Sequence, residues 1–181
     1  MHESGRRWTM LGPNGLAMVL LLSTQVLLSA PAGRAATKPT AYGPGSVAIA
    51  PFVFIGRIDE DLTRSFLERL ASLKTGSRIV DEKAYSGHLD GNSRFRSDAP
   101  IGMLLKAARA AKAEVLILGE ASRYKFLDAP GIQLRVRVIN VQSGKELNRS
   151  LAKETSWTLP GAKREAGSTA ARNIAKQWRA E

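Results

Sequence analysis

The stretch Val115-Leu-Ile-Leu118, followed by Gly119, decides the fold of this chain. Four consecutive apolar residues between polar neighbours are typical of a strand that is buried on both faces of a sheet. A second apolar run, Ser46-Val-Ala-Ile-Ala-Pro-Phe-Val-Phe-Ile55, lies earlier in the chain. Both runs predict central strands. Pro51 predicts that the earlier strand ends or lacks one ladder hydrogen bond near its carboxyl end, because proline has no amide hydrogen.

Two amphipathic segments, residues 59–74 and 98–111, predict helices. Asp59-Glu-Asp61 places acidic side chains at the positive end of the first helix dipole. Ser97 or Asp98 caps the second helix, with Pro100 tolerated in its first turn. Their apolar residues recur at helical spacing: Leu62, Phe66, Leu70 and Leu73 in the first, and Ile101, Leu104, Leu105, Ala108 and Ala111 in the second.

A short apolar segment, residues 78–80, predicts another strand after the first helix. The polar, glycine-containing stretch 81–96 predicts a surface loop. The order strand, helix, strand, helix, strand predicts a parallel sheet.

The carboxyl-terminal part has a different pattern of apolar residues. Residues 132–138 alternate between apolar and polar side chains, which predicts a half-buried antiparallel strand. The segment 128–131 predicts the turn before it and 142–145 the turn after it. A less regular strand follows over 145–157. Thr158 and Pro160 then precede a final helix that reaches Trp178. Its expected buried side consists of Ala166, Ala170, Ile174 and Trp178.

Handedness completes the expected architecture. Parallel crossovers are right-handed, so the first two helices must lie on opposite faces of the sheet. We expect an α/β three-layer sandwich with a five-stranded mixed sheet and three helices. The expected strand order is second, first, third, fourth, fifth.

Residues 1–36 are typical of a cleaved signal peptide. Arg6 and Arg7 precede an apolar stretch over 16–28, which Ser23-Thr-Gln25 interrupts, and small residues follow. An uncleaved anchor remains the alternative. Residues 37–45 predict a flexible leader, and residues 46–181 the folded domain.

The chain has no cysteine, which excludes disulfides, thiolate chemistry and a lipoprotein anchored through cysteine. Its formal net charge is +11. For an exported protein, that charge indicates an acidic protein, an anionic envelope polymer or a membrane surface as counterpart. Ordinary solvation of a charged surface explains it equally well.

Three motifs resemble the bacterial envelope family that includes the TolB amino-terminal domain, CsgG and LpoB. They are Ser46-Val-Ala-Ile-Ala-Pro-Phe52, Ala111-Lys-Ala-Glu-Val-Leu-Ile-Leu-Gly119, and Leu134-Arg-Val-Arg-Val-Ile-Asn-Val-Gln-Ser-Gly144-Lys-Glu-Leu147. Glu114 and Asn140 stand where the family usually has aspartate, and Ser143 where it has threonine. The resemblance covers residues 46–181 and implies the fold more than the function. No pair of segments reads as membrane-spanning barrel strands, so the pore of the curli-secretion member is not expected.

The sequence offers little for catalysis or metal binding. His88 is the single histidine after the signal region, and His88 and Asp90 have no evident further metal ligands nearby. No nucleophile motif accompanies His88. Neighbouring carboxylates occur in residues 59–61 and in Asp81-Glu82. The start of a helix and the start of a loop explain them more simply than a pair of catalytic carboxylates of a glycosidase does. We expect no enzyme activity, no cofactor and no metal.

A crevice beyond the ends of strands one and three is the default ligand site in an open α/β sheet. Gly56, Arg57, Gly119 and Glu120 are expected to line it. A plain strand-end turn is the simpler interpretation, because a fold by itself implies no ligand.

Four cations are the candidate binding residues: Arg123, Lys125, Arg135 and Arg137. We expect them on one uncovered sheet face, either as a basic patch or as ordinary polar alternation. Tyr124 and Phe126 are expected to point to the opposite face, which argues against a stacking platform for nucleic acid.

These observations predict a non-enzymatic accessory or scaffold protein of the periplasm or the outer-membrane inner surface. Its partner would be another envelope protein or an anionic envelope polymer, with peripheral membrane contact and homo-oligomerisation left open. The alternatives are a subunit of an oligomeric envelope assembly or secretion complex, and a small cell-wall hydrolase that would depend on His88.

Overall fold

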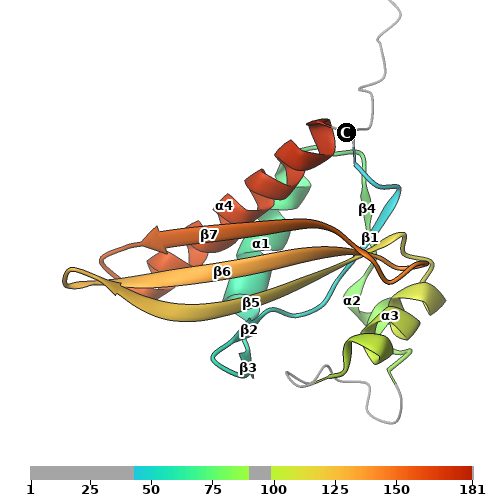
Figure 1. Cartoon of the computed structure of the whole chain (residues 1–181), viewed down its shortest axis with the longest axis horizontal. Helices are drawn as coiled ribbons and strands as arrows, with labels where there is room; N and C mark the ends of the chain where they lie inside the picture. Colours follow the sequence, from blue (N-terminus) through green and yellow to red (C-terminus); the bar gives the residue numbers. More distant parts are fainter. Residues whose placement is uncertain (1–42, 90–98, 181) are drawn as a thin grey trace, which may run out of the picture. The chain divides into compact units, whose positions relative to one another are not determined.

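Strand β5 (Val115–Phe126) lies at the centre of the sheet, as its apolar start predicts (Figure 1). The computed structural model describes residues 43–89 and 99–180. Along one edge β5 pairs first with β1 (Ser46–Ile49) and then with β2 (Val53–Phe54), and along the other with β6 (Ala129–Asn140). Outside these lie β3 (Arg57–Ile58), β4 (Arg78–Ile79) and β7 (Glu146–Thr155).

The five expected strand segments pair in the predicted order. The pairs β4–β1 and β1–β5 are parallel, and β5–β6 and β6–β7 are antiparallel, so the sheet is mixed. The described residues nevertheless contain seven strands and not five. The first expected strand is divided into β1 and β2, and β3 adds a short hairpin that the sequence analysis did not predict.

Pro51 causes the division of the first strand. Ile49 lies opposite Ile117 and Val53 opposite Glu120, so three residues of this strand face two of β5. The extra residue forms a bulge at the position where proline cannot donate to the ladder. The Phe52 amide donates instead to Thr63 Oγ1 at 2.8 Å.

The described residues form four helices beside the sheet, one more than predicted. They are α1 (Glu60–Ser72), α2 (Glu82–Ser86), α3 (Ile101–Ala110) and α4 (Leu159–Ala180). The short α2 corrects the prediction of a loop over 81–96. Asp81 caps it by accepting from the Lys83 amide, and Tyr85 anchors it in the core. Residues 90–98, including Asp90, Ser97 and Asp98, lie outside the described part. Helix α3 begins after Pro100, which is its N-cap residue, so the prediction that Ser97 or Asp98 caps this helix is wrong.

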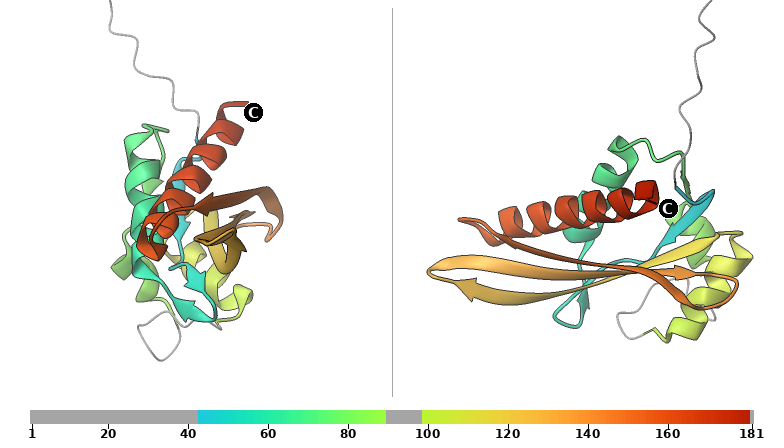
Figure 2. Two further views of the ribbon diagram at one scale, coloured as in Figure 1. Left: turned by 90° about the vertical axis from the view of Figure 1, so that its left-hand side faces the viewer. Right: turned by 45° about the horizontal axis from the view of Figure 1, so that its top comes forward.

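The helices form two layers on opposite faces, as the handedness argument predicts (Figure 2). Helices α1 and α4 share one core with alternate residues of β1, β5 and β6. Helices α2 and α3 share a second core, chiefly with Ala48 and Leu116. The four residues expected on the buried side of the last helix are indeed buried: Ala166, Ala170, Ile174 and Trp178.

The start of α1 confirms the interpretation of its acidic cluster. The Asp59 side chain accepts from the Leu62 amide at 3.0 Å, and Glu60 and Asp61 lie in the first turn. Asp59 also forms a largely buried ion pair with Lys163 of α4. These carboxylates therefore stabilise a helix end and its contact with α4.

Candidate binding surface

The four predicted basic residues do not share one face of the sheet. Arg123 lies opposite Ile132, whose side chain is in the core beneath α1 and α4. Arg135 lies opposite Glu120 on the other face. Because side chains alternate along a strand, Lys125 lies on the same face as Arg123, and Arg137 lies on the same face as Arg135. The expected four-residue patch is thus divided into two pairs.

A similar correction applies to Tyr124. It lies opposite Gly131, and a Cβ at Gly131 would meet the Tyr124 ring at 2.7 Å. Tyr124 and Phe126 therefore point away from Arg123 and Lys125, as expected, but they share a face with Arg135. The separation of aromatic from basic residues that the sequence predicts holds only along β5.

The face that carries Arg135 and Arg137 is only partly covered. Helices α2 and α3 pack on β1 and the start of β5, and leave the outer strands uncovered (Figures 1 and 2). Here Leu151 lies opposite Arg135, and Arg149 opposite Arg137. We call the surface formed by Arg135, Arg137, Leu147, Arg149 and Leu151 the open face. Leu147 and Leu151 are 51% and 49% exposed, so this surface joins apolar area to positive charge.

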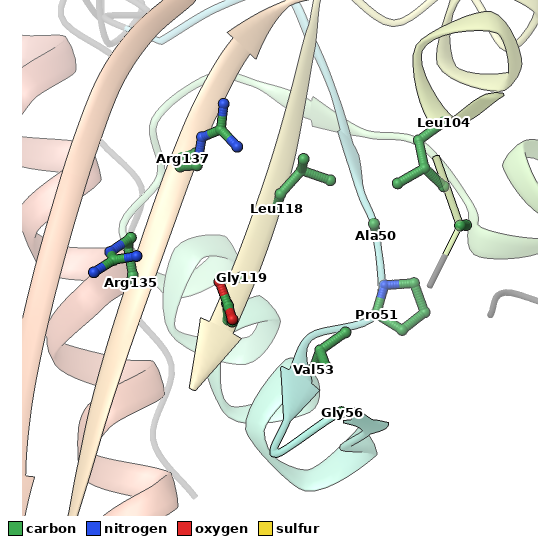
Figure 3. Close-up of a pocket in the computed structure, with 11 residues that line it drawn as sticks. Ala50, Pro51, Val53, Gly56, Leu104, Leu118, Gly119, Arg135 and Arg137 are labelled. Atoms are coloured by element: carbon green, nitrogen blue, oxygen red, sulfur yellow. The ribbon is translucent and has the colours of Figure 1, made fainter. Parts of the chain in front are cut away.

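A pocket of about 330 Å³ opens where the open face meets α3 (Figure 3). Leu118 and Gly119 of β5 lie between two walls. Arg135 and Arg137 of β6 form one wall, and the other is apolar: Ala50, Pro51, Val53 and Leu104. Such a pocket can bind an apolar group and place an anionic group against a guanidinium.

The pocket corresponds to the crevice predicted beyond strands one and three. Three of its four expected residues, Gly56, Gly119 and Glu120, do line it. Arg57 does not, and lines a separate hollow beside Phe54 and Ile58. Gly56 belongs to the turn of the β2–β3 hairpin, whereas Arg57 is the first residue of β3.

Arg137 is already engaged within the fold. Its Nε donates to Glu146 at 2.7 Å, and Arg149 Nε donates to the other carboxylate oxygen at 2.7 Å. The hydrogen bonds from Arg149 and then Arg137 lower the pKa of Glu146, and Glu146 in turn raises the pKa of Arg149. Arg135 is exposed, and no ion pair joins it to another described residue. Of the two arginines that line the pocket, Arg135 is therefore the one more available to an anionic ligand.

His88 lies exposed just after α2, with its amide bonded to the Tyr85 carbonyl. Within the described ranges no three histidine or carboxylate side chains gather closely enough to hold a metal ion. No helix in those ranges combines the length and apolar character needed to cross a bilayer.

The apolar part of this surface was not predicted from the sequence. The signal was present, because Leu147, Arg149 and Leu151 alternate along one strand and so share a face. What the sequence did not show is that α3 stops short of β7 and leaves these side chains uncovered.

Comparison with known proteins gives matches only at the level of structure. No protein-family model and no curated sequence matches the chain. The dodecamer of a PelC point variant from Paraburkholderia phytofirmans is similar, with 14% identity, a TM-score of 0.49, and coverage of 78% of this chain and 91% of that chain. The LpoB carboxyl-terminal domain from Salmonella enterica has 15% identity, a TM-score of 0.47, and coverage of 62% and 84%.

TolB from Acinetobacter baumannii also matches, with 16% identity and a TM-score of 0.42. The match covers 74% of this chain and 28% of the TolB chain. The structural neighbours of this chain thus include LpoB and TolB, two members of the envelope family that its strand motifs resemble.

Proposed function

We propose that this chain is a non-enzymatic protein of the periplasm that binds another envelope component through the open face and its pocket. The observation that carries the proposal is the exposed Arg135 at the rim of a pocket whose other wall is apolar. The signal-like residues 1–36 support the location, and the absence of cysteine argues against cysteine-linked lipidation.

The chemistry of the surface favours a protein segment with acidic and apolar side chains. An apolar side chain fits between Pro51 and Leu118, while a carboxylate meets Arg135. Leu147 and Leu151 extend the apolar area along β7. The arginines contribute orientation and association rate, and the apolar contacts contribute most of the affinity.

Crosslinking in intact cells, followed by pull-down, tests this proposal. Arg135→Glu reverses the available charge and should reduce recovery of the partner at least about tenfold. Leu151→Ser, directly across the strand pair from Arg135, should also reduce it. Lys176→Glu is the matched control, because it makes the same charge change on an exposed position of α4. If Arg135→Glu and Leu151→Ser both retain every partner that the unaltered protein recovers, the open face is not the binding surface.

A second candidate is a subunit of an oligomeric envelope assembly. Strand β7 pairs only with β6 among the described strands, so its other edge is available to a strand of a second copy. One backbone group of β7 is already engaged, because Gln177 of α4 donates to the Arg149 carbonyl at 3.0 Å. A second copy would therefore pair with the rest of that edge. Light scattering separates the two proposals, because a stable monomer at micromolar concentration disfavours the assembly.

A further inference from the structure

Three strongly exposed apolar side chains lie at one end of the sheet, far from the pocket. Trp157 is 96% exposed, Leu127 85% and Phe126 60%. Phe126 and Leu127 close the β5–β6 hairpin, and Trp157 follows β7. The Ser156 amide donates to the Pro130 carbonyl at 3.3 Å, which ties the two segments together. We call Phe126, Leu127 and Trp157 the apolar tip; Figure 1 shows both segments at the left end of the sheet.

The backbone at the tip is itself unusual. Leu127 has φ +54°, a conformation that glycine and asparagine adopt more readily. A leucine held there costs free energy in the fold and exposes apolar area to water. Replacing Leu127 with glycine or asparagine would reduce both costs. Leu127 therefore lowers the stability of the isolated domain in both ways. This points to a contact of Leu127 with something outside the domain.

Cations lie just behind the tip on both faces of the sheet. Arg123 and Lys125 lie on the α4 side, and Lys153, opposite Gln133, lies on the other. The carboxylates in the same region belong to Asp128 and Glu154. A hollow of about 470 Å³ between the hairpin and α4 is lined by Arg123, Lys125, Leu127 and Leu159, among others. Positive charge and apolar surface thus meet at the same place.

We propose that the apolar tip inserts into the interfacial region of a membrane that contains anionic phospholipid. Tryptophan, phenylalanine and leucine are the side chains that enter the headgroup and upper acyl region, and nearby basic side chains bind the anionic headgroups. Residues 37–181 hold 24 lysines and arginines against 15 aspartates and glutamates, and this excess of positive charge adds attraction over a longer range.

The shape of the tip favours a membrane over a protein partner. A stable protein interface needs about 800 Å² from each partner, formed by a broad complementary surface. The tip consists of three side chains on two connected turns, which is a wedge rather than a broad surface. A lipid interface accepts such a wedge, because it needs no complementary shape.

Quenching of tryptophan fluorescence by brominated lipids tests insertion directly. The chain has three tryptophans, and a Trp8→Phe background leaves Trp157 and the buried Trp178. With vesicles of phosphatidylethanolamine and phosphatidylglycerol, Trp157 should be quenched and shifted to the blue. Trp157→Phe should remove the quenching, since the Trp178 side chain is only 5% exposed. Unquenched Trp157 in a vesicle-bound protein overturns the proposal.

Vesicle sedimentation gives the energetic test. The combined substitutions Phe126→Ser, Leu127→Ser and Trp157→Ser should lower partitioning at least about tenfold. The matched control, Leu147→Ser with Leu151→Ser, removes exposed apolar area from the open face and should change partitioning less than about twofold. Every variant carries the same amino terminus, so residues 1–36 contribute equally to each measurement. Thermal unfolding confirms that each variant is folded.

A third arm tests the lipid charge. Arg123→Gln, Lys125→Gln and Lys153→Gln together should lower binding to phosphatidylglycerol vesicles and reduce its salt dependence. Equal binding of the unaltered protein to pure phosphatidylcholine overturns the requirement for anionic lipid. Failure to bind any vesicle, together with concentration-dependent self-association that the tip variant abolishes, assigns the tip to a protein contact instead. Arg135→Glu should leave vesicle binding within about twofold, because this proposal does not rest on the open face.

Discussion

The ring of Phe52 lies directly across Gly119 at the centre of the sheet. A Cβ at position 119 would lie 2.5 Å from the ring, closer than carbon atoms can approach. Phe52 is fully buried and contacts Phe66 of α1, with ring centroids 5.0 Å apart. The bulge at Pro51 is what turns Phe52 over β5, so the glycine and the bulge depend on each other.

Gly119→Ala should therefore destabilise the fold by about 1–3 kcal/mol, because the buried Phe52 ring has little room to move. Urea unfolding followed by far-ultraviolet circular dichroism measures the difference. Gly102→Ala is the matched control, since nothing lies within 4 Å of its added Cβ. Within α3 that change should be neutral or stabilising by up to about 1 kcal/mol. Equal effects at the two positions would contradict the packing argument.

Thr63→Val should lower the free energy of unfolding by about 1–3 kcal/mol. The Thr63 hydroxyl accepts the Phe52 amide at 2.8 Å in a buried environment, and valine keeps the shape but not the acceptor. Thr63→Ser retains the oxygen and serves as the control. Hydrogen exchange at the Phe52 amide should become faster in Thr63→Val than in Thr63→Ser. Unchanged protection of that amide would show that it has another acceptor.

Ile55→Asn should stabilise the protein by about 1 kcal/mol. Ile55 and Gly56 form the two-residue turn between β2 and β3, with φ +50° and +74°. A β-branched residue is strained in that conformation, whereas Asn-Gly is the preferred sequence for such a turn. Ile58→Asn in the adjoining strand should give no gain. A lower unfolding midpoint for Ile55→Asn would show that the exposed isoleucine makes a stabilising contact.

The open face should become less stable in acid through Glu146. Its pKa lies below the ordinary value of 4.5 because Arg149 and Arg137 donate hydrogen bonds to the carboxylate. A carboxyl whose pKa is lower in the folded than in the unfolded state stabilises the fold at any pH above its pKa in the unfolded state. That contribution is lost as the pH falls through the folded value. The difference in unfolding midpoint between the unaltered protein and Glu146→Gln should therefore shrink as the pH is lowered from 7 to about 3.

Nuclear magnetic resonance titration of the Glu146 carboxyl carbon measures the same effect directly. Arg149→Met removes the largest cause and should raise the pKa of Glu146 toward its ordinary value. Arg137→Met should raise it by a smaller amount, because the Arg137 hydrogen bond is the second cause. The opposite ranking would mean that Arg137 is the principal partner in solution.

The division of the predicted basic patch follows from the geometry of the β5–β6 hairpin. Phe126 lies opposite Ala129, so a two-residue turn joins the strands. In such a hairpin, odd-numbered residues of one strand share a face with even-numbered residues of the other. Arg123 must then lie on the opposite face from Arg135. The turn predicted over 128–131 is wrong by a few residues, since Pro130 and Gly131 belong to β6. A two-residue turn at either place would have separated the two arginines.

The short elements β3 and α2 could not be predicted from the sequence for a different reason. Strand β3 has two residues and α2 has five, too few for a periodic pattern to emerge. Helix α2 exists because Tyr85 and Leu89 are buried against the helix α3 layer. The hairpin β2–β3 follows the bulge at Pro51, and its first strand pairs with β5 through Val53 and Phe54.

The sequence alone determined the α/β class, the order of the five main strand segments, and the placement of α1 and α3 on opposite faces. Local apolar runs, helical periodicity and the handedness of crossovers specify these features without reference to distant residues. Only the tertiary structure decided which side chains remain exposed: the open face beside α3, the division of the basic residues, and the apolar tip. Exposure depends on how far a helix extends over a sheet and on strand register, and both are set by packing between segments far apart in the chain.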